Sequence, residues 1–166
     1  MIVLVGFMGA GKTTVGRLLA THLGLRFVDS DKVIEETEGL AVREIFETQG
    51  EAAFRQIETE TITGLLDGPD AVLAVGGGAL TSAGVRTALA GHRVVLLDVA
   101  LDEALERVAS DPGRPMLHTP DLSGLYTRRQ DAYRDAADVA VQVSGRSPRE
   151  VVAEVLAALG EVGVGE

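Results

Sequence analysis

The residues best suited to chemistry lie near the N-terminus, in the segment GFMGAGKTTVGRLLA (residues 6–20). Residues 6–13 fit the pattern G-x-x-x-x-G-K-[ST], between the apolar run 1–5 and an amphipathic stretch. Between a strand and a helix, such glycines let successive backbone N–H groups point at phosphate oxygens, and the helix N-terminus adds partial positive charge. This context favours a nucleoside triphosphate site over a simple glycine turn with an exposed lysine.

Two side chains of this motif have individual tasks. Lys12 is expected to bridge the outer phosphates, and Thr13 to give its hydroxyl to Mg²⁺. The acid that completes the Mg²⁺ site is either Asp29, after LRFV, or Asp98, after RVVLL, because strands that end in Asp usually supply it in such folds. On pattern alone the longer apolar run favours Asp98.

Asp29 also belongs to a carboxylate pair, Asp29-Ser30-Asp31. Alternate side chains of a strand share a face, so one carboxylate could serve a metal ion while the other meets a hydroxyl. The alternative interpretation is that Ser30 or Asp31 caps the following helix. The sequence pattern leaves both interpretations open.

Further candidate ligands are glycines and arginines. The glycines of VGGGAL (residues 75–80) follow a predicted strand and either contact a small ligand through their N–H groups or form only a turn. Arg55 borders the buried stripe of an amphipathic helix, so it either extends to the surface or forms, with Arg129, a fork for a carboxylate. Arg114 lies in a proline-rich stretch, where a mobile guanidinium could close over a phosphate.

Apolar periodicity predicts the elements that must position these residues. Strands are expected at residues 1–5, 25–29, 71–75, 93–99 and 138–143. Helices are expected from the glycine loop to residue 23 and at residues 32–37, 41–46, 51–66, 82–89, 102–109, 122–136 and from 148 onward. In the helix at 51–66, the inward residues should be Phe54, Ile57, Ile62 and Leu65. Alternating strands and helices predict a parallel sheet covered on both sides.

Composition limits the class of protein. A chain of 166 residues without a linker predicts one domain, and a net charge of -10 argues against nucleic acid or anionic membrane as a partner. The chain has no cysteine, no signal-peptide pattern and no apolar stretch long enough to span a membrane. We therefore expect a cytoplasmic monomer that binds anions through local basic groups.

Together the motifs resemble those of the shikimate kinases, small P-loop kinases of aromatic amino-acid biosynthesis. GFMGAGKTTVGRLLA, FVDSD, IFETQGEAAFRQIE, VGGGAL and RPML occur in that family's order and spacing over nearly the whole chain. The resemblance implies an α/β, three-layer P-loop kinase fold, a single domain over residues 1–166 with a central five-stranded parallel sheet flanked by helices. It also implies a short lid at about residues 110–121 and a substrate-binding helical region at about residues 31–62.

The resemblance further implies site residues. ATP would be bound by Gly9, Ala10, Gly11, Lys12, Thr13, Thr14, Arg107, Arg114 and Arg146. Within this set, Arg107 would stack on adenine. Mg²⁺ would be held by Thr13 and, through water, by Asp29, which the family pattern selects over Asp98. Shikimate would contact Asp31, Phe46, Phe54, Arg55, Gly76, Gly77, Gly78 and Arg129.

The implied reaction transfers the γ-phosphoryl group of ATP to the 3-hydroxyl of shikimate, with Lys12, Asp31 and Arg114 as catalytic residues. Two features depart from the family pattern or leave a choice: Asp131 stands where the family commonly has proline, and either Arg128 or Arg129 could hold the substrate carboxylate. The alternatives are a kinase for another acceptor, such as gluconate or a nucleoside monophosphate, and a nucleotide-binding module without catalysis.

Overall fold

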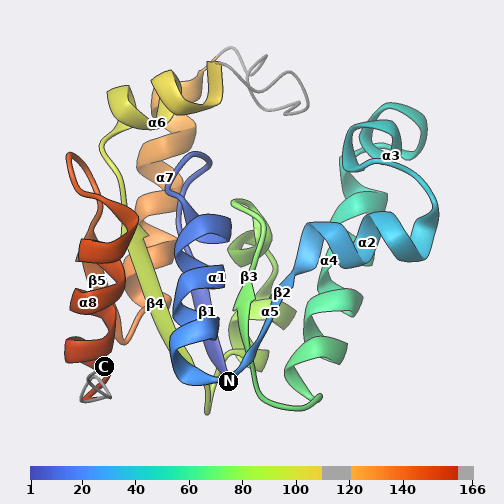
Figure 1. The fold of residues 1–166 in the computed structure, drawn as a ribbon. Coiled ribbons are helices and arrows are strands. Elements are labelled where there is room, and N and C mark those ends of the chain that lie inside the picture. Colours follow the sequence, from blue (N-terminus) through green and yellow to red (C-terminus); the bar gives the residue numbers. More distant parts are fainter. Residues whose placement is uncertain (110–120, 161–166) are drawn as a thin grey trace.

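Five short strands form one parallel sheet in the computed structural model, which describes residues 1–109 and 121–160 (Figure 1). The sheet order is β2-β3-β1-β4-β5, and all four pairings are parallel. The strands are β1 (Ile2–Val5), β2 (Arg26–Asp29), β3 (Ala71–Ala74), β4 (Arg93–Asp98) and β5 (Val139–Gln142). The predicted five-stranded parallel sheet is therefore confirmed.

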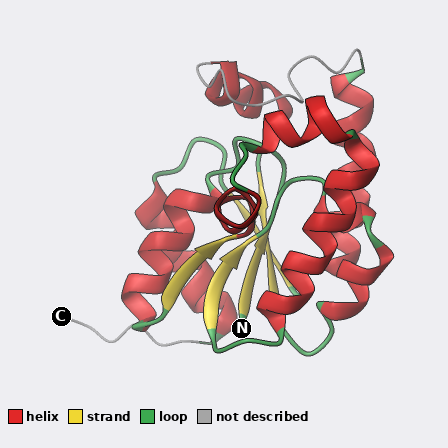
Figure 2. Cartoon of the chain, turned by 90° about the vertical axis from the view of Figure 1, so that its right-hand side faces the viewer, coloured by secondary structure: helices red, strands yellow, loops and turns green. Residues whose placement is uncertain are grey.

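Helices cover both faces of the sheet (Figure 2). They are α1 (Lys12–Leu23), α2 (Ser30–Glu38), α3 (Val42–Gln49), α4 (Glu51–Leu66), α5 (Ala83–Ala88), α6 (Leu101–Ala109), α7 (Leu122–Ala136) and α8 (Pro148–Leu159), with the 3-10 turn η1 (Ala79–Thr81). Crossovers between parallel strands are right-handed, so this strand order places α1 on one face and α4, α5 and α7 on the other. The last helix, α8, packs beside α1.

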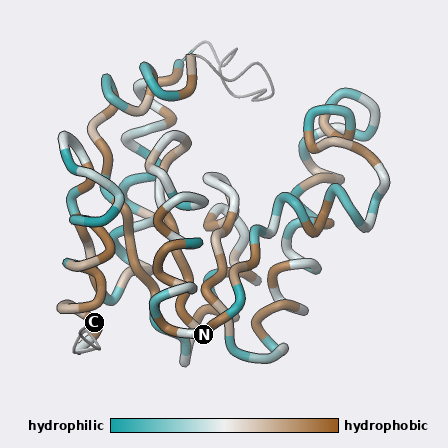
Figure 3. Tube along the Cα trace, viewed as in Figure 1, coloured by the Kyte–Doolittle hydropathy of each residue, from teal (hydrophilic) through white to brown (hydrophobic). Residues whose placement is uncertain are grey.

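The main apolar core lies between these layers, and the inner strands β1 and β3 consist of hydrophobic residues only (Figure 3). β1 is central and β3 is buried over its whole length, which explains their unbroken apolar sequences. A second, smaller cluster consists of Ile34, Ile45 and Phe54. This cluster gives the α2–α4 lobe, which stands to one side of the sheet in Figure 1, its own packing centre.

The buried stripe of α4 differs from the predicted one. Phe54 and Ile62 are buried as expected, but the other fully buried positions are Glu58 and Leu66, whereas Ile57 and Leu65 are only partly buried. Positions 54, 58, 62 and 66 recur every four residues, so they lie along one side of the helix. An acidic side chain therefore faces the interior, next to the carboxyl ends of the strands.

None of the helices in the described residues is long and apolar enough to cross a membrane. The loops after β1, β2 and β3 all leave the same edge of the sheet, because the strands are parallel. Ligands of open α/β sheets bind at this carboxyl edge, where the strand order changes direction. In this sheet the order changes beside β1, which is followed by the loop at residues 6–11.

Two helical glycines provide a test of how closely α1 and α4 pack against the neighbouring elements. A Cβ on Gly16 in α1 would lie 2.4 Å from a ring carbon of Phe27, whereas a Cβ on Gly64 in α4 would meet no atom within 4 Å. We expect Gly16→Ala to lower the free energy of unfolding by about 1–2 kcal/mol, since overpacking outweighs the better helix propensity of alanine. Gly64→Ala should raise it by about 0.5–1 kcal/mol. Urea denaturation of both variants measures the difference, and equal stabilisation by both would contradict the packing of α1 on β2.

Candidate active site

The loop between β1 and α1 forms a cradle of backbone groups. Gly9 and Gly11 have φ values of 78° and 87°, a left-handed region that residues with a side chain rarely adopt. A Cβ on Gly9 would also come within 2.7 Å of the carbonyl oxygen of Ala104 in α6. The Lys12 Nζ donates to the carbonyl oxygens of Gly6 at 2.7 Å and Phe7 at 3.1 Å, so the ammonium lies across the loop.

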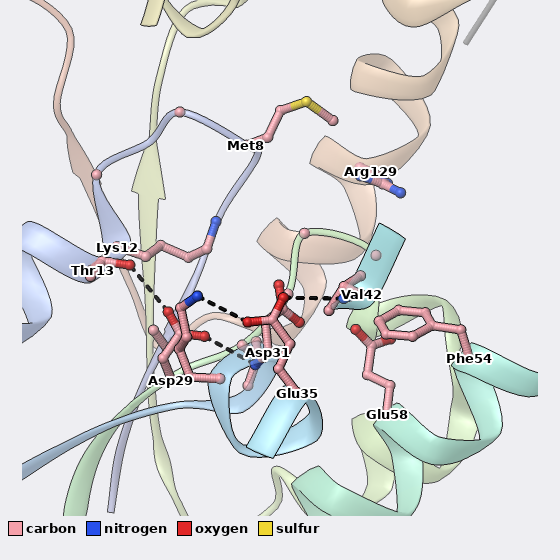
Figure 4. Close-up of a pocket in the computed structure, with 18 of the residues that line it drawn as sticks. Met8, Lys12, Thr13, Asp29, Asp31, Glu35, Val42, Phe54, Glu58 and Arg129 are labelled. Carbon is pink, nitrogen blue, oxygen red and sulfur yellow. Dashed lines mark hydrogen bonds and ion pairs between the residues drawn. The ribbon is translucent and has the colours of Figure 1, made fainter. Parts of the chain in front are cut away.

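A cavity of about 570 Å³ opens beside this loop at the carboxyl edge of the sheet. Figure 4 shows Asp31 between Lys12 and Thr13 on one side and Glu58 and Phe54 on the other. The cavity brings together most of the residues predicted for nucleotide, metal and substrate: Gly9, Gly11, Lys12, Thr13, Thr14, Asp29, Asp31, Phe46, Phe54, Arg55, Gly76, Gly77, Gly78, Arg107 and Arg129.

Asp29 is the acid that faces the nucleotide loop. Its Oδ2 accepts a hydrogen bond from the Thr13 hydroxyl at 3.2 Å, and its Oδ1 accepts from the N–H of Asp31 at 3.0 Å. The second bond caps α2, so the cap is Asp29 and not Ser30 or Asp31, the residues of the alternative interpretation. A hydroxyl and a carboxylate are the hard oxygen ligands that suit Mg²⁺, which takes few protein ligands and keeps several waters and phosphate oxygens.

Asp98 does not line the cavity. Its carboxylate is nearly buried and accepts hydrogen bonds from the side-chain amides of Gln142 at 2.8 Å and Gln130 at 3.3 Å. These bonds tie β4 to β5 and α7. The longer apolar run before Asp98 therefore reflects a more central strand, and the pattern-based preference for Asp98 as the metal acid is not supported by the geometry.

Asp31 has an unusual electrostatic environment. Its Oδ1 is buried without a hydrogen-bond partner among the described residues, and it would lie 3.1 Å from a Cβ on Gly76. Burial, followed by the negative charges of Asp29 and Glu58, raises the pKa of Asp31 from 3.8 to about 6, against the lowering effect of Lys12. Asp31 therefore has an oxygen available to a ligand and a pKa close to neutrality.

The three glycines of VGGGAL lie directly against charged side chains. A Cβ on Gly76 would lie 2.7 Å from Glu58 Oε2, and one on Gly78 would lie 2.3 Å from Arg55 Nη2. A Cβ on Gly77 would lie 3.3 Å from Arg129 Nη1. Any side chain at these positions would displace the charged groups, so the segment does more than form a turn.

Arg55 is held in place from several sides. Its Nη1 donates to Glu58 Oε1 at 2.7 Å, and its guanidinium lies 5.3 Å and 5.8 Å from the ring centroids of Phe54 and Phe46. The side chain is 19% exposed, so it does not extend into solvent as a surface arginine would. Burial raises the pKa of Glu58, and the Arg55 charge opposes this shift. Burying such a pair is favourable only with good geometry, which this contact has.

Glu58 was not among the predicted site residues, although it is the last residue of the segment IFETQGEAAFRQIE. The signal was an acidic residue three positions after Arg55, where the two side chains of a helix meet. The predicted buried stripe of this helix contained only apolar residues, so Glu58 was left out of it.

Of the two neighbouring arginines in α7, only Arg129 lines the cavity. Arg129 is 6% exposed, and its guanidinium lies 5.9 Å from the Phe7 ring centroid. Burial lowers the pKa of Arg129. Arg128 is 65% exposed and lies 3.6 Å from Asp121. The two arginines therefore lie on different sides of α7, and Arg129 is the one that faces the cavity.

A second cavity of about 220 Å³ adjoins the first, and Gly11, Thr14 and Arg107 line both. Its other walls are Ala10, Val15, Val143, Arg146, Pro148 and Val151. Arg107 donates to the Gly9 carbonyl at 3.0 Å and pairs with Glu103, while Arg146 pairs with Glu154. Apolar and basic walls next to the phosphate loop could hold a nucleotide base. Arg114 and the predicted lid, apart from Asp121, lie outside the described residues.

The chain is similar to known proteins over nearly its whole length. The family model for shikimate kinase matches residues 8–160. A shikimate kinase of Pseudomonas syringae pv. tomato is 46% identical over 166 residues, with 97% of this chain and 96% of that protein covered. One of Mycobacterium avium is 44% identical over 161 residues, with coverages of 95% and 92%.

A solved structure of a shikimate kinase has the same fold. Shikimate kinase from Acinetobacter baumannii in complex with shikimate superposes with a TM-score of 0.92 at 37% identity, covering 99% of this chain and 94% of that one. The family model spans nearly the whole chain, and both relatives exceed 40% identity over almost their full lengths. The chain therefore belongs to the shikimate kinase family.

Proposed function

We propose that this protein transfers the γ-phosphoryl group of ATP to the 3-hydroxyl of shikimate, giving shikimate 3-phosphate and ADP. The observation that carries the proposal is one cavity in which the phosphate-binding loop, Asp31 and the Arg55–Arg129 pair meet. A phosphate donor and an acceptor with both a carboxylate and hydroxyls fit such a cavity. Membership of the shikimate kinase family agrees with this combination.

The nucleotide is bound by the loop at residues 9–14, with Lys12 on the outer phosphates and the base between Arg107 and the residues around Arg146. Successive N–H groups and a lysine stabilise a polyphosphate without requiring a basic protein surface. Thr13 and Asp29 hold Mg²⁺, and their 3.2 Å contact supports this role. When bound, Mg²⁺ neutralises charge on the phosphate oxygens.

The acceptor is oriented by opposite charges at its two ends. The carboxylate of shikimate pairs with Arg55 and Arg129, and the N–H groups of residues 76–78 contact its oxygens, while the rings of Phe46 and Phe54 contact its apolar parts. Asp31 contacts the hydroxyl groups at the other end of shikimate. Holding the alcohol in line with the terminal phosphate supplies much of the rate, because positioned reactants avoid the entropic cost of meeting.

Asp31 orients the attacking hydroxyl and accepts its proton. Its pKa of about 6 supports this role, because a general base is most effective when its pKa lies near the working pH. Lys12 and Arg114 stabilise charge on the transferring group; Arg114 stays a prediction from the sequence. We also propose that the protein acts as a cytoplasmic monomer without nucleic-acid partners, as its acidic composition suggests.

Acceptor specificity is the direct test of the proposed function. With Mg·ATP and shikimate, gluconate or a nucleoside monophosphate offered in parallel, shikimate should give the highest kcat/KM, by at least about 100-fold, because buried polar groups reject acceptors that leave them unpaired. A coupled ADP-release assay measures all three rates. A preference for gluconate or a nucleotide would refute shikimate as the acceptor, and binding of ATP without turnover of any acceptor would indicate a non-catalytic module.

Asp31→Asn should separate chemistry from nucleotide binding. We expect kcat to fall by about 10²–10⁴-fold, because the amide cannot accept the proton, while the Kd for Mg·ADP stays within about twofold of the parent value. Steady-state kinetics and calorimetry give the two quantities. Glu36→Gln, an exposed change in the same helix, should leave both unchanged. Near-normal turnover in Asp31→Asn would remove Asp31 from the chemistry.

The same substitution should stabilise the folded protein at high pH. The pKa of about 6 in the folded state exceeds the unfolded value, so the contribution of Asp31 to stability is present below about pH 4 and is lost as the pH rises through 6. Asparagine cannot ionise and escapes this loss. Relative to the parent, Asp31→Asn should therefore gain about 2 kcal/mol between pH 4 and pH 8.

Urea denaturation at both pH values, without Mg²⁺ or nucleotide, measures this gain. Glu36→Gln again serves as the control and should show no pH-dependent difference from the parent. If the stability difference between Asp31→Asn and the parent were the same at pH 4 and pH 8, the Asp31 carboxylate would not be destabilised by its surroundings.

A further inference from the structure

We infer that Tyr133 is a positioning residue for the acceptor: its hydroxyl fixes the backbone at Gly77 beside Arg129 and so keeps the carboxylate-binding side of the cavity assembled before the substrate arrives. This inference deepens the proposed function and rests on it, because it assumes that Arg129 receives the substrate carboxylate. Neither the motif pattern nor the predicted site residues include Tyr133.

The hydroxyl of Tyr133 joins two elements that are far apart in the sequence. Tyr133 lies in α7, four residues after Arg129, so both side chains leave the same side of that helix. Its hydroxyl donates to the carbonyl oxygen of Gly77, in the loop after β3, at 2.5 Å. The ring is 1% exposed, so water does not compete for this bond. Tyr133 therefore fixes α7 to the glycine loop at the point where that loop borders the cavity.

The same bond controls the direction of a neighbouring amide. In a planar trans peptide the C=O of one residue and the N–H of the next point in opposite directions. With the Gly77 carbonyl directed at Tyr133, the N–H of Gly78 is directed away from α7. Because Gly77 has no Cβ, Arg129 Nη1 and Tyr133 Oη can both lie close to this peptide. A Cβ at Gly77 would lie 3.3 Å from Arg129 Nη1 and 3.6 Å from Tyr133 Oη.

Arg129 needs such a support more than Arg55 does. Arg55 is paired with Glu58 at 2.7 Å and lies 3.6 Å from Glu51. Within the described part of the chain, Arg129 has no ion pair, and its Nε is buried without a hydrogen-bond partner. Its guanidinium contacts the Phe7 ring and lies beside Tyr133 and the glycine loop. The groups in direct contact with Arg129 are thus neutral, while the charges of Arg55 and Glu58 act on it without an ion pair.

A neutral support suits an arginine that must bind an anion. A carboxylate in place of the Tyr133 hydroxyl would pair with Arg129 and compete with the carboxylate of the substrate. Burial raises the pKa of Tyr133, so the hydroxyl stays protonated and acts as a donor over the physiological range. Tyr133 can therefore orient its surroundings while the positive charge of Arg129 stays available.

The chain offers a matched control in the same helix. Tyr126 also lies in α7, and its hydroxyl donates to the Val99 carbonyl, in the loop after β4, at 2.7 Å. Both tyrosines join α7 to a carbonyl beyond a strand end, but Gly77, the partner of Tyr133, lines the cavity, whereas Val99, the partner of Tyr126, does not. Tyr133→Phe and Tyr126→Phe remove the same group from comparable bonds, and each keeps its ring.

The test combines these variants with Arg129→Lys and measures shikimate and Mg·ADP affinity by calorimetry, together with steady-state kinetics. In Tyr133→Phe we expect the KM and Kd for shikimate to rise about 5- to 10-fold, the change that loss of one hydrogen bond supports, with kcat reduced less than about threefold. The Kd for Mg·ADP should not change, which also shows that the variant is folded. Tyr126→Phe should leave both affinities unchanged. Tyr133→Phe should weaken shikimate binding less in the Arg129→Lys background than in the parent, because the two residues act together.

Three outcomes would overturn the inference, and they differ in what else they affect. Unchanged shikimate affinity in Tyr133→Phe, beside weakened binding in Arg129→Lys, would overturn the role of Tyr133 alone. Unchanged shikimate affinity in Arg129→Lys would refute carboxylate binding by Arg129 and, with it, both the inference and that part of the proposed function. Equal losses of shikimate and Mg·ADP affinity in the two tyrosine variants would show a general structural role.

Discussion

The lack of side chains at residues 76–78 is the constraint on which the rest of the site depends. At each of these glycines a Cβ would enter the space of a charged group: Glu58 and Asp31 at Gly76, Arg129 at Gly77 and Arg55 at Gly78. The loop after β3 is therefore the place where α2, α4 and α7 can bring their charged side chains together. Asp31 and the two arginines belong to three different helices, and this close approach lets them share one cavity.

The charges gathered there are costly to the folded state and useful to the reaction. Asp29, Asp31 and Glu58 lie near one another and partly out of water, and the raised pKa of Asp31 records the cost. The nearby cations compensate only in part: Arg55 is paired with Glu58, and Lys12 lowers the pKa of Asp31 without cancelling the effects of burial and of the other carboxylates. A protein of net charge -10 thus concentrates cations where an anionic acceptor and a nucleotide must bind. Stability given up at such a site is the usual cost of activity.

The two sides of the cavity are built differently. The nucleotide side is continuous with the main core: the loop at residues 6–11 joins β1 to α1, and α6 packs against Gly9. The acceptor side belongs largely to the α2–α4 lobe, which packs around Ile34, Ile45 and Phe54. The Thr13–Asp29 contact joins α1 to the start of this lobe, and the Arg55–Gly78 approach joins α4 to the loop after β3.

The sequence by itself determined what depends on neighbours along the chain. The glycine-rich loop after β1, the five strands and the bounds of α4 and α7 all follow from patterns of neighbouring residues, which set backbone geometry directly. The resemblance already selected Asp29 over Asp98, and the tertiary structure places Asp29 beside Thr13. Only the tertiary structure put the α2 cap at Asp29, placed Arg129 and not Arg128 at the cavity, and revealed Glu58 and Tyr133. Those outcomes depend on which residues from distant elements meet at the sheet edge. Periodicity gives the face of each element, but packing between elements decides what that face contacts.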